Sequence, residues 1–431
     1  MRSLAAAALT TLLLALPAAA QSPRKPDLSA VDARMRALVA QYRLDGASLW
    51  LSHNGVPMLT AHYGGYGPTT REPIASASKW VSALVLARLV ERGALRWDST
   101  VGEWWPEVAA DKRGITLAQL FSHTSGLAGE ESGCIGNAMT TLQACAAQIL
   151  AAPLARTPGS TFSYGGLSMH VAGAMVERAT GRTWDTLFIA EVVQPLGLTG
   201  TDYGFTSTAP GYVSVPNPRI AGGVRSSLRD YARLMAMWQA DGRVPDAEGR
   251  ADARSGAVYL LPATLREMQR DRAAGLRRGS VPTLADLYPG WGYGLGFWIL
   301  DTGRAGNPVL ESSPGAFGFQ GWVDGAAGVA GVFLVRDLNS RMGPEAMQIQ
   351  RDAARAFEFQ RSTQSTTSPA PVPFARAGLT PAPAASDYAL RPVPPALPRA
   401  HTSSTRADRP AARAAAAGDQ DEPRRRAERE R

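Results

Sequence analysis

The sequence predicts an α/β (α+β) protein in which helices flank an antiparallel sheet and an all-helical insert divides the sheet-forming parts of the chain. Apolar runs at 46–51 and 56–60 flank Asn54-Gly55, and Asn-Gly between apolar runs is typical of a β-hairpin. Between about 100 and 287, apolar residues recur mainly at helical spacing. Beyond residue 290, glycines punctuate aromatic and β-branched runs, which predict three or four more strands.

The order of the elements sets the topology. A helix over 28–42 precedes the hairpin, and a mostly apolar helix runs from Ser76 to about Gly93. Thr116 and Gln119 form a capping box for a short helix. Further helices are expected at 142–151, 168–180, 184–193, 228–239, 263–270 and 344–359. Strands are expected at 290–300, 309–312, 319–324 and 329–336. Because strands from both ends of the sequence must meet in one sheet, the insert lies to one side of it.

The two ends of the chain differ in composition from the part between them. Residues 1–20 combine a basic start, a short apolar run and an Ala-x-Ala exit, which predicts a secretory signal peptide and a periplasmic or secreted protein. That apolar run is too short to span a membrane. Residues 362–431 are rich in Pro, Ala, Ser, Thr and Arg and are predicted to be disordered. One folded domain is therefore expected over 28–361.

Cysteine, histidine and charge content narrow the possible partners. Cys134 and Cys145 are the only cysteines and both belong to the exported part, so they are predicted to pair with each other. The five histidines lack metal-ligand spacing, and neither a metal nor another cofactor is predicted. Much of the net charge of +8 comes from arginines in the C-terminal tail, so no nucleic-acid partner is expected. Weak attraction to anionic envelope surfaces is the expected consequence.

A Ser-x-x-Lys motif, Ser76-Ala77-Ser78-Lys79, stands at the start of the apolar helix. Residues three apart lie on one helix face, so the Lys79 amine can reach the Ser76 hydroxyl. A partly desolvated lysine can act as a base near neutral pH and activate the hydroxyl as a nucleophile. The alternative is structural: Ser76 or Ser78 caps the helix, and Lys79 extends to water.

Three further motifs follow this one along the chain. They are the Gly-Ile-Thr segment at 114–116 that leads to His-Thr-Ser-Gly-Leu at 123–127, Pro-Gly-Ser-Thr-Phe-Ser-Tyr at 158–164, and Ala-Gly-Gly-Val-Arg-Ser-Ser-Leu-Arg-Asp at 221–230. With these motifs in this order, the sequence over about 28–359 resembles the serine β-lactamase and penicillin-recognising superfamily, in its class C-like and esterase branch. The resemblance implies a β-lactamase/transpeptidase-like fold and an acyl-enzyme formed on Ser76.

The resemblance also implies a tyrosine near the nucleophile, in a motif usually written Tyr-x-Asn. Here it reads Tyr164-Gly165-Gly166. Tyr164 would exchange a proton with Ser76 and the leaving group. Gly166 replaces an asparagine whose amide would bind the substrate amide, which argues against β-lactam or peptide substrates. The alternative is that Tyr164 is an aromatic core residue at a helix entry.

The third motif of the family, Lys-Thr-Gly or His-x-Gly, appears as Ser313-Pro314-Gly315. The retained Gly315 would let substrate approach the strand. By resemblance, the backbone N–H groups of Ala316 and Ser76 would form the oxyanion hole. Ser313 offers no cation for a substrate carboxylate, which favours neutral esters, although a simple turn at Ser-Pro-Gly remains an alternative.

His123 is the residue that a Ser-His-Asp triad would require. The resemblance makes it a structural turn residue instead, and the chain contains no Gly-x-Ser-x-Gly motif. The sequence therefore predicts an exported serine hydrolase that uses Ser76, Lys79 and Tyr164 on small carboxylic esters. Two alternatives stay open: a D-amino-acid peptidase, carboxypeptidase or β-lactamase acting on cell-wall-like amides, and a catalytically weak protein that binds a cell-wall ligand. The oligomeric state is not predicted.

Overall fold

The computed structural model describes residues 26–129, 133–283, 285, 288–303 and 308–365, with the backbone alone for 359–365. The predicted signal peptide over 1–20 lies outside these residues, as does the predicted tail beyond residue 365. Among the described residues, no helix is both long and apolar enough to cross a membrane.

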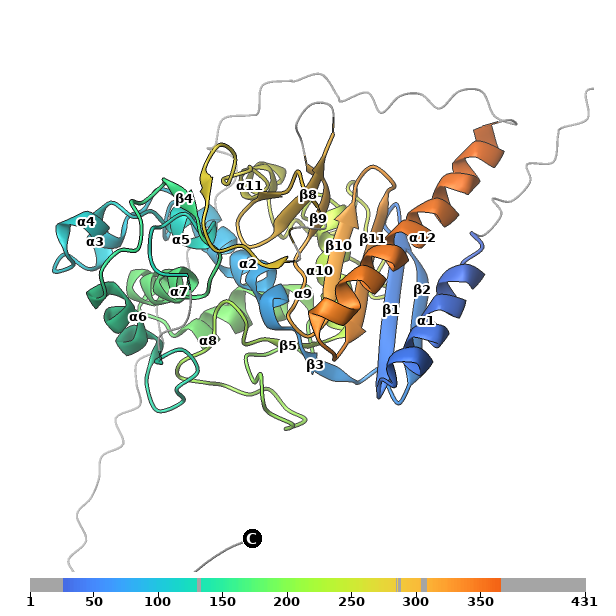
Figure 1. Cartoon of the computed structure of the whole chain (residues 1–431), viewed down its shortest axis with the longest axis horizontal. Coiled ribbons are helices and arrows are strands. Elements are labelled where there is room, and N and C mark those ends of the chain that lie inside the picture. Colours follow the sequence, from blue (N-terminus) through green and yellow to red (C-terminus); the bar gives the residue numbers. More distant parts are fainter. Residues whose placement is uncertain (1–25, 130–132, 284, 286–287, 304–307, 366–431) are drawn as a thin grey trace, which may run out of the picture. The chain divides into compact units, whose positions relative to one another are not determined.

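A seven-stranded antiparallel sheet joins the two ends of the described chain (Figure 1). Its strand order is β2-β1-β11-β10-β9-β8-β7. The strands are β1 Gly46–His53, β2 Val56–Gly64, β7 Gly292–Tyr293, β8 Trp298–Thr302, β9 Pro308–Ser312, β10 Gln320–Asp324 and β11 Val329–Val335. The N-terminal hairpin pairs with the C-terminal strand, so that Leu49 lies opposite Phe333. This confirms the predicted meeting of distant strands.

Two turns explain where the strands begin and end. Asn54 and Gly55 have φ values of 49° and 79°, the left-handed backbone that a tight hairpin requires. The sequence over 290–300 forms two strands rather than one, because the chain reverses through Gly294–Gly296. The N–H of Gly294 donates to Phe297 O at 3.0 Å, and Gly296 has a φ of 92°. Five strands therefore form where three or four were predicted.

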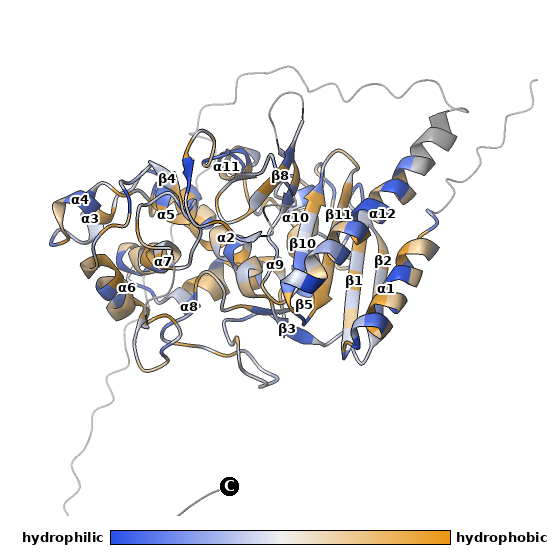
Figure 2. Ribbon diagram, viewed as in Figure 1, coloured by the Kyte–Doolittle hydropathy of each residue, from blue (hydrophilic) through white to orange (hydrophobic). Residues whose placement is uncertain are grey.

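Helices cover both faces of the sheet, and strand alternation decides which side chains meet them. Leu49 and Leu51 pack with α1 (Ser29–Tyr42) and α12 (Asn339–Ser365). Trp50 points to the opposite face, in the same core as α2 (Ser78–Glu91) and α10 (Leu228–Gln239). Figure 2 shows hydrophilic residues on the visible surfaces of α1 and α12. The two helices are therefore amphipathic covers of the sheet.

The rest of the chain is mainly helical. Its helices are α3 Val101–Trp104, α4 Ala110–Arg113, α5 Leu117–Phe121, α6 Leu142–Ala151, α7 Leu167–Thr180, α8 Trp184–Phe188, α9 Gln194–Leu196 and α11 Pro262–Met268. A π-helical turn at Ile189–Val193 joins α8 to α9. The predicted capping box of Thr116 and Gln119 is confirmed at the start of α5.

Two short strand pairs, which the sequence did not predict, lie in and beside this helical region. β3 (Arg71–Pro73) pairs with β5 (Arg225–Ser227), and β4 (Thr161–Phe162) pairs with β6 (Arg277–Arg278). The first pair joins the segment before the Ser-x-x-Lys motif to the start of α10. It therefore links the helical region directly to the candidate nucleophile.

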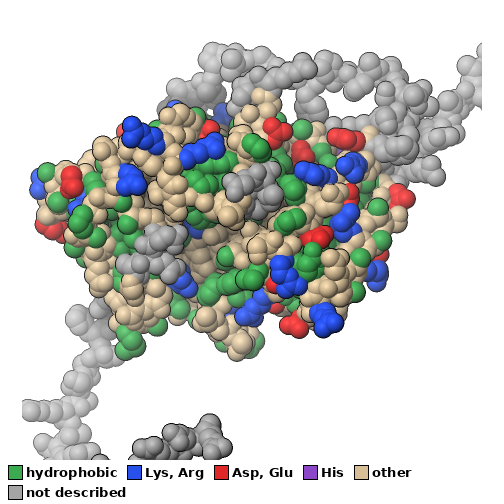
Figure 3. Space-filling model, in the orientation of Figure 1, with side chains coloured by type: hydrophobic (Ala, Val, Ile, Leu, Met, Phe, Trp, Pro, Cys, Tyr) green, Lys and Arg blue, Asp and Glu red, His purple; other side chains and the backbone are tan. Residues whose placement is uncertain are grey.

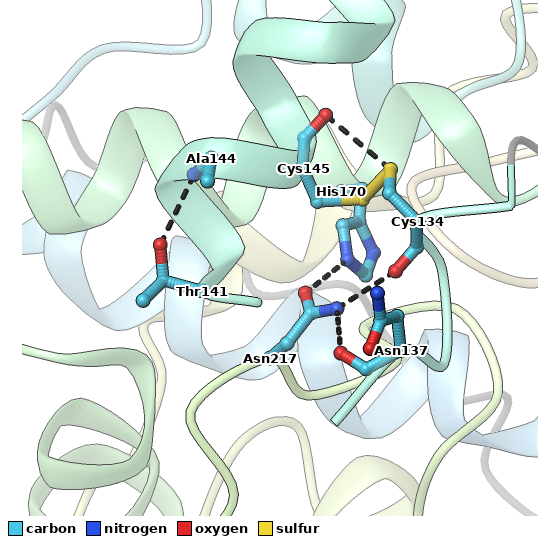
Figure 4. The surroundings of a disulfide bond; sticks show 7 residues. All are labelled: Cys134, Asn137, Thr141, Ala144, Cys145, His170 and Asn217. Carbon is cyan, nitrogen blue, oxygen red and sulfur yellow. Dashed lines mark hydrogen bonds between the residues drawn. A yellow bond between two sulfur atoms is a disulfide. The ribbon is translucent and has the colours of Figure 1, made fainter. Parts of the chain in front are cut away.

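The two cysteines form a disulfide between a loop and α6 (Figure 4). Cys134 and Cys145 have Cα atoms 5.3 Å apart, and this is the pairing expected from the sequence. The side-chain amide of Asn217 donates to Cys134 O at 2.9 Å and to Asn137 O at 3.1 Å, while its oxygen bonds the ring of His170 on α7. The loop is thereby fixed to two helices and to the segment that leads to β5.

On the surface shown in Figure 3, Lys and Arg side chains are interspersed with Asp and Glu. Below the surface, α2 is almost entirely buried. Trp80 of α2 packs edge-on against Trp238 of α10 and stacks on Phe297, with ring centroids about 5 Å apart. This packing fixes the helix that begins just after Ser76.

Candidate active site

The candidate nucleophile Ser76 lies in a 3-10 turn at Ala75–Ala77, immediately before α2. Ala75 has a φ of 45°, a conformation that a residue with a side chain rarely adopts. Hydrogen bonds to α10 and to the segment before β5 help to hold the turn: Ile74 N–H donates to Val224 O at 2.9 Å, Val224 N–H to Ser78 Oγ at 3.0 Å, and Tyr231 Oη to Ala77 O at 3.2 Å. The strained turn keeps the Ser76 side chain at a half-buried position.

Lys79 lies about one helical turn after Ser76, in α2, and is only 3% exposed. Its Nζ donates to Ser76 Oγ at 3.0 Å and to Ala221 O at 2.9 Å. It also lies 4.6 Å from the centroid of the Tyr164 ring, within the range of a cation–π contact. The alternative in which Lys79 extends to water is therefore wrong. Neither serine caps the helix through its side chain, since Ser78 instead binds Val224.

Tyr164 follows β4 and brings its ring to Lys79. The ring stacks on Trp298 with centroids 5.5 Å apart and planes inclined by 22°. The backbone N–H of Tyr164 donates to Ser280 O at 2.8 Å. Within the described residues, the Tyr164 hydroxyl makes no hydrogen bond to Ser76 or Lys79. The structure thus brings the three predicted catalytic residues together, with the lysine on the ring face of the tyrosine.

The segment at 313–316 packs against the nucleophile turn. Ser313 Oγ donates to Ser76 O at 3.2 Å, and its side chain is buried. A Cβ at Gly315 would lie 2.2 Å from Ile74 O, so only glycine allows this close approach. In the described part of the chain, the N–H groups of Ser76 and Ala316 donate to no other group. Two unused donors beside a nucleophile suit an oxyanion hole.

Gly166 lies at the N-terminus of α7, beside Ala221, whose carbonyl accepts a hydrogen bond from Lys79. A Cβ at this position would lie 3.5 Å from Ala221 Cβ and 3.9 Å from Ile135 Cδ1, both ordinary contact distances. A Cβ would therefore fit there, and the glycine leaves the position without a side chain. Because the Ser313 hydroxyl turns towards Ser76 O, neither of the two altered positions presents a polar side chain to a substrate.

His123 lies behind Tyr164, in contact with Tyr293, and is 2% exposed. Its Nε2 lies 3.1 Å from Tyr293 Oη, and Gly165 N–H donates to its Nδ1 at 3.4 Å. Burial, together with the nearby charge of Lys79, holds the pKa of His123 well below its usual value of 6.5. The ring nitrogens of this histidine bond Gly165 and Tyr293 and make no bond with Ser76.

Sequence reasoning missed three parts of this site. The Ala221 carbonyl that binds Lys79 is a backbone atom, so no side chain marks it. Tyr293 and Trp298 were interpreted only as strand residues, although both contact the ring of Tyr164. The glycines around Tyr293 were the available signal, because Gly294 and Gly296 form the turn that places β7 beside β8.

Comparisons with known proteins identify the family of the chain. The family model described as Beta-lactamase matches residues 31–355. Esterase EstB of Burkholderia gladioli is 30% identical over 66% of this chain and 81% of its own length. Penicillin-binding protein 4 of Amycolatopsis lactamdurans is 28% identical over 69% of this chain and 82% of its own.

A solved structure extends the likeness to the fold. The crystal structure of a putative β-lactamase from Bacteroides dorei superimposes with a TM-score of 0.64, at 29% identity over 72% of this chain and 91% of that one. The fold predicted by the resemblance is thereby confirmed. With a family model that spans most of the chain and with esterase and penicillin-binding relatives, the protein belongs to the β-lactamase family and is a serine hydrolase.

Proposed function

We propose that the protein is an exported esterase that hydrolyses small carboxylic esters through an acyl-enzyme on Ser76. The observation that carries this proposal is the 3.0 Å contact between Lys79 Nζ and Ser76 Oγ, inside a site where Ala221 O fixes the amine. A base within hydrogen-bond distance is what a serine hydroxyl needs to become a nucleophile.

The geometry suggests the order of bond changes. In acylation, the Lys79 amine takes the Ser76 proton as Oγ attacks the ester carbonyl, and the N–H groups of Ser76 and Ala316 stabilise the oxyanion. When the tetrahedral intermediate collapses, the carbon–alkoxide bond breaks and the alkoxide receives a proton by way of Lys79 and Tyr164. In deacylation, water adds to the acyl carbon, loses its proton to the same groups, and Ser76 leaves with a proton restored.

Several features support esters over amides. An alkoxide leaves more readily than an amine, and the site offers no side-chain amide at Gly166 to bind a substrate amide. The buried hydroxyl of Ser313 provides no charge for a substrate carboxylate. Similarity to Esterase EstB points the same way.

Hydrolysis of cell-wall-like amides is the second candidate, because of the similarity to Penicillin-binding protein 4. A D-amino-acid peptidase, carboxypeptidase or β-lactamase would use the same Ser76 and Lys79. A ligand-binding protein without useful activity is the third, and the intact contact between these two residues argues against it.

Export to the periplasm or medium is part of the proposal. Its support is the signal-like sequence at 1–20 and the disulfide between Cys134 and Cys145, since structural disulfides persist in oxidising compartments. Sequencing the N-terminus of the protein recovered from periplasm and medium tests this point. Mature protein that begins near residue 21 supports export, and an intact Met1 in the cytoplasm contradicts it.

The function itself is tested with one preparation and a substrate panel. The panel contains p-nitrophenyl acetate and butyrate, a D-alanyl-D-alanine peptide and a chromogenic cephalosporin. We expect kcat/KM to be highest for the two esters and Ser76→Ala to abolish their turnover. Ser52→Ala, which removes a buried hydroxyl bonded to Gln239, serves as the control and should stay active. Higher kcat/KM for the peptide or the cephalosporin would overturn the preference for esters.

A further inference from the structure

Tyr164 is held from behind by aromatic residues that the proposed mechanism does not use. The rings of His123 and Tyr293 lie 4.5 and 6.3 Å from the Tyr164 ring, and Trp298 stacks on it at 5.5 Å. Tyr293 and Trp298 are paired across β7 and β8 with their rings 4.9 Å apart. The plane of Tyr164 is therefore set by residues of the sheet as well as by Lys79.

His123 binds both peptide neighbours of Tyr164. The N–H of Ser163 donates to His123 O at 2.8 Å, and the N–H of Gly165 donates to Nδ1 at 3.4 Å. Because Nδ1 is an acceptor, the hydrogen of the neutral ring is assigned to Nε2, which donates to Tyr293 Oη at 3.1 Å. His123 thus connects the backbone on both sides of Tyr164 to the hydroxyl of Tyr293.

The backbone at this point allows little movement. His123 has a left-handed φ of 61°, which is uncommon for a residue with a side chain. A Cβ at Gly165 would lie 1.5 Å from Gly129 O, so the chain next to Tyr164 is in direct contact with a second segment. A displacement of His123 would consequently be transmitted to Tyr164 rather than absorbed by a flexible loop.

His123 and Tyr293 keep the same protonation state while Lys79 and Tyr164 transfer protons. Burial and the charge of Lys79 keep the pKa of His123 well below 6.5, so its ring is neutral at neutral pH. Burial, and secondly the nearby phenol of Tyr164, raise the pKa of Tyr293 well above 10. Neither residue competes for the proton that passes between Ser76, Lys79 and Tyr164.

We propose that His123 and Tyr293 form a hydrogen-bonded positioning pair that holds the Tyr164 ring against Lys79 and directs its hydroxyl towards the leaving group. The inference rests on the proposed role of Tyr164 in the serine hydrolase reaction. In a Ser-His-Asp triad the histidine would bond the nucleophile. Here the imidazole of His123 would act through Tyr164 and not on Ser76.

A double-mutant cycle between Tyr293→Phe and Tyr164→Phe tests the proposal. Tyr293→Phe removes one hydroxyl and should lower kcat for p-nitrophenyl acetate about tenfold, with KM changed by less than about twofold. In the Tyr164→Phe background the same change should have no further effect, because the hydroxyl that it positions is gone. His123→Asn, which tolerates the left-handed backbone, should show the same dependence on Tyr164.

Tyr259→Phe is the matched control, because Tyr259 is also buried and its hydroxyl donates to a backbone carbonyl, Glu191 O, at 2.8 Å. It should lower the Tm without lowering kcat. Equal kcat in Tyr293→Phe and Tyr259→Phe, or losses that multiply in the Tyr164→Phe background, would overturn the positioning role. Full activity in Ser76→Ala would contradict the proposed function itself. That result is independent of the comparisons of kcat among the tyrosine variants, which test only the positioning role.

Discussion

The two sides of the candidate active site differ in how their polar groups are used. On the proton-transfer side, Lys79 is buried and bonded to Ser76 Oγ and Ala221 O at 3.0 and 2.9 Å. On the substrate-holding side, Gly166 has no side chain and Ser313 turns its hydroxyl into the protein. The Lys79–Ser76 contact of the Ser-x-x-Lys motif is therefore present, whereas positions 166 and 313 lack the polar groups that the family resemblance implies for substrate binding.

Removing the base tests the proton-transfer side and should have the largest effect. Lys79→Met keeps the bulk of the side chain but removes the amine, and kcat/KM for p-nitrophenyl acetate is expected to fall by about 10³-fold or more. Lys112→Met is the matched control, because Lys112 is also a buried lysine and pairs with Asp111. Comparable losses in both variants would mean that Lys79 is only a structural residue.

Removing the tyrosine hydroxyl should have a smaller but clear effect. Tyr164→Phe keeps the ring that contacts Lys79 and Trp298, so the fold should be unchanged while kcat falls about 10²-fold. Steady-state kinetics on aryl and alkyl acetates measures the loss, which should be larger for the poorer alkoxide leaving group. Full activity in this variant would remove Tyr164 from the proton-transfer side.

A buried carboxyl behind the nucleophile helix should affect stability without affecting chemistry. Glu311 binds Trp238 and Gln269 through one oxygen, and burial raises its pKa to about 7 from 4.5. Because the folded state holds the proton more tightly, stability should fall as the pH rises from about 5 to about 7, by up to about 3 kcal/mol. Urea unfolding at pH 5 and pH 8 should show this fall in the parent and a smaller one in Glu311→Gln. An equal fall in both proteins would refute the assignment.

Restoring a side chain on the substrate-holding side should have the smallest effect on esters. Gly166→Asn is the variant, because a Cβ there meets Ala221 and Ile135 only at the ordinary contact distances of 3.5 and 3.9 Å. We expect ester turnover to stay within about threefold and turnover of a chromogenic cephalosporin to rise. Gly165→Ala is the contrasting variant, since its Cβ would overlap Gly129 O and should destabilise the fold. An unchanged ratio of cephalosporin to ester turnover in Gly166→Asn would show that this position does not select the substrate.

Local patterns predicted much of the fold. Helical spacing placed α6 and α10 at their observed bounds, and Asn54-Gly55 located the hairpin, because these features depend on neighbouring residues. The split of 290–300 into two strands was missed because the glycines mark a reversal whose position depends on the sheet around it. The pairing of β3 with β5 was missed because strands of three residues carry little pattern.

In the candidate site, too, relations between neighbouring residues were predicted and contacts between distant residues were missed. Ser76 and Lys79 were predicted together because they lie three positions apart, about one helical turn, which is a local relation. The Ala221 carbonyl is 142 positions away from Lys79, and the hydroxyl of Tyr293 is 170 positions away from His123. Contacts of this kind are set by how the sheet and the helical region meet. The family resemblance implied that His123 is a structural turn residue, but its contacts with Tyr164 and the neighbouring backbone are seen only in the structure.

In the proposed reaction Ser76 carries the acyl group during turnover, and mass spectrometry of the enzyme tests this directly. The protein is quenched in acid during steady-state hydrolysis of p-nitrophenyl acetate and then digested. We predict one acetyl group on the peptide that contains Ser76, absent from Ser76→Ala and more abundant when Tyr164→Phe slows deacylation. An acetyl group on another residue, or turnover by Ser76→Ala at the rate of the parent enzyme, would show that Ser76 is not the nucleophile.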